Sequence, residues 1–143
     1  MRKFLAVFAF LTIAAIGVGH AQTNLQALPT ATAAHSYAVN LTWQNNCAST
    51  VTCTFDIYVC NGAAAACPAT GSQQLWLKLN SAPITALAYQ DSRPTILVPG
   101  VTVSYVAYAN ANGQTAGPSN EAVVPLPLAP VAPSTQAGTT TAQ

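Results

Sequence analysis

The four cysteines are the residues of this 143-residue chain whose type and spacing most clearly predict chemistry. Cys47, Cys53, Cys60 and Cys67 lie close together, well after an apolar N-terminal segment. In an exported protein such a cluster typically forms disulfides. Zinc is the alternative, but the chain has no C-x2-C pair, and the same lack argues against a redox-active pair. We therefore expect disulfides and no metal ligands.

Acidic and basic side chains are too few and too dispersed to predict catalysis. Hydrolysis needs a nucleophile with a base, a pair of carboxylates or a metal. Asp56 is predicted to point outward from a strand, Asp91 to bond its own turn backbone, and Glu121 to open the last strand. His35 has no acidic neighbour in the sequence. We expect a protein that is not an enzyme, with no catalytic residues and no cofactor.

The N-terminus has the pattern of a secretory signal peptide, residues 1–21. Arg2 and Lys3 precede an apolar run over residues 4–18, and small residues lead to a predicted cleavage site after Ala21. An uncleaved anchor is the alternative. No later segment is apolar enough to enter a membrane, so we expect no membrane insertion after cleavage. The pattern predicts a secreted, periplasmic or cell-surface protein.

The rest of the chain, about 120 residues, is long enough for one domain. It is almost free of charge, with Lys78 and Arg93 against Asp56, Asp91 and Glu121. A chain without a basic patch has nothing with which to release counterions from a nucleic acid or to dock on an anionic lipid surface. We therefore expect no nucleic-acid partner.

Alternating apolar residues predict short β-strands. In residues 37–43, one face carries Val39, Leu41 and Trp43. Residues 101–109 alternate in the same way, and Asn112-Gly113 predicts a tight turn before a returning strand at residues 121–124. Further strands are predicted over residues 54–60, 73–80 and, more weakly, 83–89. No helix is predicted.

Two segments flank these strands. Residues 22–34 are small, polar and aperiodic, which predicts a leader that pairs at most at its end. Residues 128–143 are rich in Pro, Thr, Ser and Gly, which predicts a disordered tail. Between them, residues 35–127 are predicted to form an all-β domain, a seven-stranded antiparallel β-sandwich. The order of the connections stays open.

Several motifs of this domain together resemble a fibronectin type III domain of the bacterial kind. In chain order they are Val39-Asn-Leu-Thr-Trp43, Phe55-Asp-Ile-Tyr58, Tyr89-Gln-Asp91, Pro99-Gly100, Asn112-Gly113 and Gly117-Pro-Ser-Asn-Glu121. The resemblance implies an immunoglobulin-like sandwich of fibronectin type III topology. It also implies that Trp43 is the buried aromatic residue of the second strand and that Leu97 fills the core before the Pro-Gly turn.

The chain departs from this family in two ways. Val103 stands where the family has a corner tyrosine, so the hydroxyl-to-backbone bond of that corner is missing, and we expect Tyr105 to take part of its place. Paired cysteines are not general in the family. In addition, the chain has no Arg-Gly-Asp triplet, so integrin binding has no residues on which to rest.

The predicted strand over residues 54–60 constrains the disulfides. Cys53 and Cys60 lie at its opposite ends, roughly 20 Å apart at ~3.3 Å per residue, which is too far to pair. Cys47 precedes the strand and Cys67 follows it. We therefore expect the pairs Cys47–Cys53 and Cys60–Cys67, each closing a short loop.

The resemblance also implies a candidate binding surface. In the family's arrangement Tyr58, Trp76, Val106 and Tyr108 point outward from one sheet and form an exposed aromatic strip. Such a strip suits stacking on sugar rings or anchoring a protein partner, although outward tyrosines are also common as ordinary cross-strand pairs. We expect an exported, non-enzymatic binding or adhesion module with a protein or carbohydrate ligand. The alternative is a structural spacer or subunit of a surface assembly.

Overall fold

A computed structural model describes residues 24–33, 36–62, 66–67 and 75–128 of the chain. The predicted signal peptide, His35 and the predicted tail beyond residue 128 lie outside these ranges. Within them the chain forms eight β-strands and no helix. Accordingly, the described part of the chain contains no helix with the length and apolar character that crossing a membrane requires.

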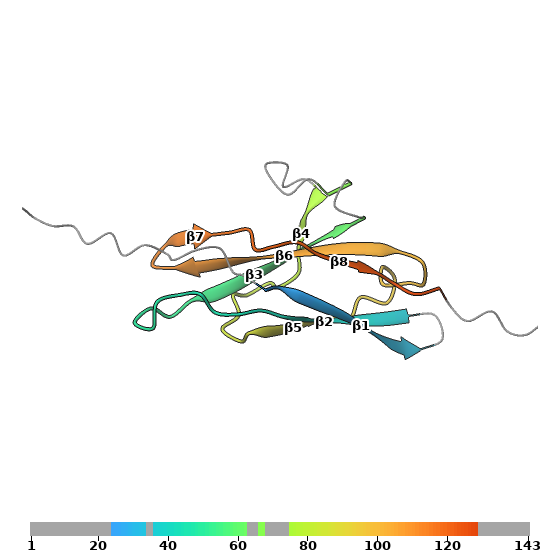
Figure 1. Cartoon of the computed structure of the whole chain (residues 1–143), viewed down its shortest axis with the longest axis horizontal. Helices are drawn as coiled ribbons and strands as arrows, with labels where there is room; N and C mark the ends of the chain where they lie inside the picture. Colours follow the sequence, from blue (N-terminus) through green and yellow to red (C-terminus); the bar gives the residue numbers. More distant parts are fainter. Residues whose placement is uncertain (1–23, 34–35, 63–65, 68–74, 129–143) are drawn as a thin grey trace, which may run out of the picture.

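The strands form two antiparallel sheets that face each other as a sandwich (Figure 1). The first sheet has the order β1-β2-β5, with β1 at Gln26–Ala33, β2 at Ser36–Thr42 and β5 at Ala88–Asp91. The second sheet has the order β4-β3-β6-β7, with β4 at Leu77–Lys78, β3 at Thr54–Asn61, β6 at Thr102–Ala111 and β7 at Gln114–Ala116. The last strand, β8 (Ala122–Pro125), pairs with β6 beyond the end of β7.

Because β7 and β8 follow each other along the same edge of β6, they correspond to one interrupted strand. The sandwich therefore has seven strands, which is the number predicted, although β1 was not among the strands predicted from the sequence. The all-β fold class is confirmed. The turn between β6 and β7 is also confirmed, since Asn112 and Gly113 have φ values of 51° and 74°.

The core lies between the sheets and follows the predicted alternation. Its largest fully buried side chains include Val39 and Leu41 of β2, Phe55, Ile57 and Val59 of β3, and Val103 and Tyr105 of β6. Trp43 is buried, and its ring meets Phe55 edge-on at a centroid distance of 5.5 Å. Leu97 is fully buried as well. The implied roles of Trp43 and Leu97 are confirmed.

The N-terminal boundary of the domain differs from the prediction. Residues 26–33, predicted as part of a leader, form β1, which pairs with β2 from Gln26–Thr42 to Ala33–Ser36. Leu25, just before this strand, is buried in the core. The sequence signal was weak because the residues that β1 turns toward the core, Ala27 and Pro29, are small or cyclic. Backbone pairing with β2, and not a pattern of large apolar side chains, therefore holds β1 in the sheet.

The predicted strand at residues 73–80 is also corrected, because only β4 remains of it within the described residues. Leu75 and Leu77 are 52% and 57% exposed, so these two side chains lie outside the core, whereas Leu79 packs against it. Asn80 follows the C-terminal end of β4 and lies at the same edge of β3. Its Oδ1 accepts from the Ile57 N–H at 2.8 Å and its Nδ2 donates to the Phe55 carbonyl at 3.0 Å. A buried amide thus completes the edge of β3 in place of a strand.

Both predicted disulfides are formed. Cys47 pairs with Cys53 and Cys60 pairs with Cys67, with Cα–Cα distances of 6.4 and 5.9 Å. Each disulfide ties a loop to one end of β3, and no free cysteine occurs in the described residues. On the chain-entropy estimate, each such loop contributes about 2 kcal/mol to the free energy of unfolding.

Candidate binding face

Three of the predicted binding residues lie together on the outer face of the second sheet. Tyr58 of β3 pairs with Val106 of β6, and Asp56 pairs with Tyr108, so the two tyrosines are diagonal neighbours. Their rings meet edge-to-face at a centroid distance of 5.3 Å and an interplanar angle of 74°. We call Tyr58 and Tyr108 the tyrosine pair. Both side chains are half-buried, so part of each ring faces solvent.

Trp76 lies at the side of this face. It directly precedes β4, whose Lys78 pairs with Tyr58, and its side chain is partly buried. Because β4 is short and lies at the edge of the second sheet, Trp76 lies toward that edge. It does not lie in the middle of an aromatic strip between two long strands.

Val106 occupies the predicted position on the outer face but is only 3% exposed. The predicted exposure of Val106 is therefore wrong. Ser104, the next residue of β6 on the same face, is fully buried, and its Oγ donates to the Gly62 carbonyl at 2.9 Å. Gly62 thus lies against this end of the face, and the Cys60–Cys67 disulfide ties Cys67 to the end of β3.

Gly117 determines where the ring of Tyr108 can lie. Its φ of +147° is unfavourable for other residues, and a Cβ at this position would be 2.6 Å from Cδ1 of Tyr108. The ring therefore rests directly on the backbone between β7 and β8. Ser119 fixes this connection to Ala107, because its N–H donates to the Ala107 carbonyl and its Oγ accepts from the Ala107 N–H, both at 2.9 Å. The tyrosine pair is consequently held by rigid neighbours.

A polar cluster borders the tyrosine pair. Asp56 forms a salt bridge with Lys78 at 2.8 Å and accepts from Asn80 at 3.1 Å and from Asn110 at 3.0 Å. Burial alone would raise the pKa of Asp56, but the hydrogen bonds from Lys78, Asn80 and Asn110 and the charge of Lys78 outweigh it, so the pKa lies below its ordinary value. Burial, followed by the proximity of Tyr58, raises the pKa of Tyr108 above its ordinary value. The rim of the face is polar but its charges are compensated.

A second polar cluster is buried between the sheets. Asp91 accepts from the Tyr105 hydroxyl at 3.0 Å, and its carboxylate forms two bonds with the Arg93 guanidinium, at 2.8 Å to Nε and 2.7 Å to Nη2. The predicted bond of Asp91 to its own turn is present as well, from the Arg93 N–H at 3.3 Å. Burial, followed by the Asp91 charge, raises the pKa of Tyr105, and the bond to Asp91 raises that of Arg93.

Sequence reasoning missed this cluster, although one signal for it was present. Tyr105 was predicted to face the core, and a buried tyrosine hydroxyl needs a hydrogen-bond partner. The partner proves to be the Asp91 carboxylate, so Tyr105 does not replace the hydroxyl-to-backbone bond of the family's corner. The cluster joins the end of β5 to the centre of β6 and is structural in its contacts.

Glu121 stands apart from both clusters. Its Oε1 is buried and has no hydrogen-bond partner in the structure. In the parts of the chain that the structure describes, no three His, Cys, Asp or Glu side chains gather as a metal ion would require. What the geometry offers for recognition is therefore the half-exposed tyrosine pair with its neutral polar rim.

No family model and no curated protein sequence matches the chain. Solved structures do match. An Fn3-like protein from Clostridium thermocellum is 23% identical over 78% of this chain and 96% of that one, with a TM-score of 0.52. A human FNIII domain solved in solution is 16% identical over 91% and 95%, with a TM-score of 0.55. Domains A168–A170 of titin are 15% identical over 77% of this chain and 32% of that one, with a TM-score of 0.52.

Proposed function

Because the chain has a fibronectin type III-like fold, which in general serves binding or structural modules, we propose that it is an exported, non-enzymatic binding or adhesion module. Its place of action is the cell envelope or the extracellular space, and its ligand is a protein or a carbohydrate. The contact residues are Tyr58 and Tyr108, with Trp76 at their side. The observation that carries the proposal is the edge-to-face contact of the tyrosine pair on the outer face of the second sheet.

Half-exposed aromatic rings held in place before a ligand arrives are effective anchors. They bury a large area while losing little conformational entropy, and truncating such residues commonly costs more than about 1 kcal/mol of binding energy. Gly117 and the bonds of Ser119 to Ala107 provide this rigidity for Tyr108. Val106, which lies beneath the surface, serves as support and not as a contact.

Export is supported by two features. The predicted signal peptide would direct the chain out of the cytoplasm. The two disulfides are consistent with an extracellular location, since such bonds form and persist in oxidising compartments. A non-enzymatic role is supported by the use of charged side chains, because Asp56 and Asp91 are both occupied in salt bridges.

The proposal is tested with the mature chain, beginning after residue 21, on a glycan array and on immobilised envelope proteins. Tyr58→Ala and Trp76→Ala should each weaken binding about tenfold. Leu28→Ala is the matched control, because Leu28 is 68% exposed on the first sheet, on the other side of the sandwich. Circular dichroism checks that each variant is folded. Equal binding by all three folded variants would refute the tyrosine pair as the contact.

A structural role is the second candidate, and β1 favours it. This strand has β2 as its one described strand partner, and it carries the exposed Leu28. An edge strand of this kind can pair with another chain. Light scattering over a range of protein concentrations separates the two functions. A monomer at every concentration supports the binding module, and concentration-dependent polymers support the assembly.

A further inference from the structure

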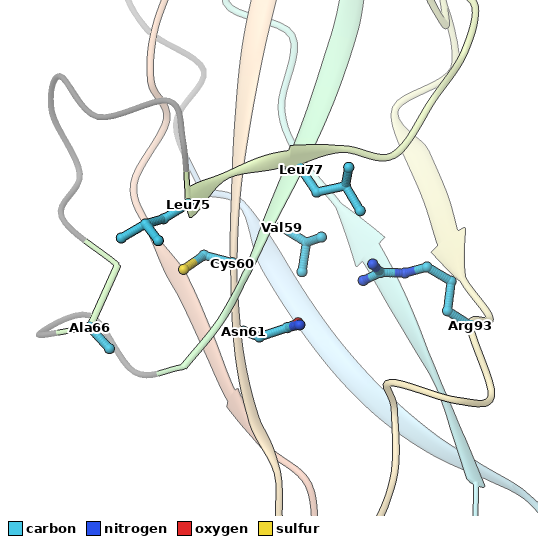
Figure 2. A pocket seen from close by; sticks show the side chains of 7 residues that line it. All are labelled: Val59, Cys60, Asn61, Ala66, Leu75, Leu77 and Arg93. Atoms are coloured by element: carbon cyan, nitrogen blue, oxygen red, sulfur yellow. The ribbon is translucent and has the colours of Figure 1, made fainter.

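A pocket of about 260 Å³ lies at the end of β3, next to the residue at which β4 begins (Figure 2). Leu75 and Leu77 line one side of it, and Arg93 reaches it from the chain that follows β5. Figure 2 shows the guanidinium of Arg93 directed toward Val59 and Leu77. We propose that this pocket binds an extended segment of a partner polypeptide, through its main chain and one aliphatic side chain.

Among the described residues, no strand pairs with the β4 edge of β3 beyond Val59. The backbone groups of Phe55 and Ile57 point toward this edge, because Phe55 N–H donates to the Ile84 carbonyl at 2.7 Å and the Ile57 carbonyl accepts from Leu79 N–H at 2.8 Å. With the two-residue period of a strand, Asn61 presents its N–H and C=O to the same edge. However, β4 pairs only with Tyr58 and Val59. Among the described residues no backbone bond joins Asn61 to this edge.

Arg93 has an unused hydrogen-bond donor. Nε and Nη2 of Arg93 bond to the Asp91 carboxylate, but Nη1 is buried and has no hydrogen-bond partner in the structure. Asp91 already compensates the charge of Arg93, so the pocket has no net charge with which to prefer an anion. A neutral acceptor therefore suits Nη1, and a peptide carbonyl is such an acceptor.

One wall of the pocket is apolar. Leu75 and Leu77 are each more than half exposed, and Val59 lies behind them. The volume of about 260 Å³ is below the roughly 300–1,000 Å³ of pockets for drug-sized molecules, so it suits one aliphatic side chain with its peptide unit. A strand edge, a donor for a carbonyl and an aliphatic slot together describe the recognition of an extended peptide by β-strand addition.

The test uses the blocked tripeptide acetyl-Ala-Leu-Ala-amide as the probe and the mature chain labelled with ¹⁵N. We expect saturable chemical-shift changes at the backbone amides of Asn61 and Leu77. The same peptide methylated on its leucine nitrogen loses the donor for the Asn61 carbonyl and should bind at least about fivefold more weakly. Acetyl-Ala-Asp-Ala-amide should also bind more weakly, because its charged side chain does not suit the apolar wall.

Variants locate the site. Leu77→Gln should weaken binding about fivefold, whereas Leu28→Gln, which changes an equally exposed leucine on the other sheet, should leave it unchanged. Arg93→Lys keeps a cation for Asp91 but removes Nη1, and it should also weaken binding. Tyr58→Ala should bind the tripeptide as the native chain does, so this test is independent of the tyrosine pair. No saturable shift at Asn61, or equal affinities of Leu77→Gln and Leu28→Gln, would overturn the proposal.

Discussion

Removing the Asp91 carboxylate should destabilise the domain more than removing any other charge in its described part. Asp91 is 2% exposed and accepts from Tyr105 and from two nitrogens of Arg93. Asp91→Ala leaves a hydroxyl and a guanidinium without this acceptor. Breaking a buried ion pair costs about 3–5 kcal/mol. Since the Arg93 side chain is 25% exposed and can recruit water, we expect about 3 kcal/mol, the lower end of that range.

This loss is large beside the whole free energy of unfolding, which is about 5–15 kcal/mol for a domain. Two variants calibrate it. Tyr105→Phe removes one hydrogen bond to a charged acceptor and should cost about 1.5–3 kcal/mol. Lys78→Ala breaks the salt bridge to Asp56, in which the lysine side chain is 37% exposed, and should cost less than about 1 kcal/mol.

The assay is unfolding in urea, followed by tryptophan fluorescence, to which the buried Trp43 and the partly buried Trp76 both contribute. The free energies are compared only where the dependence on urea concentration has the same slope in native and variant chains. If Asp91→Ala lost no more stability than Lys78→Ala, the reasoning about burial would be refuted.

Three further predictions concern pH and backbone shape. Burial and the Asp91 charge raise the pKa of Tyr105 above its ordinary 10.0, so its contribution to stability is complete below that pH and falls as the pH rises. Tyr105→Phe should therefore reduce the loss of stability at alkaline pH. Equal slopes of stability against pH in the native chain and the variant would contradict this. The pKa of Asp56 is lowered from 3.8, so its contribution to stability is present above about pH 4 and is lost as the pH falls below it. In thermal unfolding, Asp56→Asn should therefore lose less stability at acid pH than the native chain does. The same loss in both chains would count against this. Gly117→Ala should lower the free energy of unfolding by about 1–3 kcal/mol and shift the NMR signals of the Tyr108 ring. Gly113→Ala, where a Cβ meets no atom within 4 Å, should leave that ring in place. Unshifted ring signals in both variants would be the contrary result.

The parts of the fold that could be predicted are those in which side chains alone fix the orientation of a strand. In residues 37–43, a large apolar residue at every second position allows one face only to enter the core. By contrast, β1 turns Ala27 and Pro29 inward, and these residues give no such pattern. Its position depends on the ladder with β2, which only the folded chain provides.

The candidate binding face also has features that the sequence predicted and features that it did not. The outward direction and proximity of Tyr58 and Tyr108 followed from strand alternation and the family's strand order. The burial of Val106 did not, because strand alternation gives the face on which a side chain lies and not what covers that face. The partner of the Tyr105 hydroxyl was likewise set by the packing of one sheet on the other.

Charge compensation in this domain has a consequence for the kinetics of association. Four of the five charged side chains in the described residues form two salt bridges, Asp56–Lys78 and Asp91–Arg93, and only Glu121 lies outside them. Such a surface projects almost no electric field into solvent. A partner of the proposed kind would therefore be met by unsteered diffusion, with an association rate constant of about 10⁵–10⁶ M⁻¹s⁻¹ that hardly changes with ionic strength. Tight complexes of this domain would owe their affinity to slow dissociation.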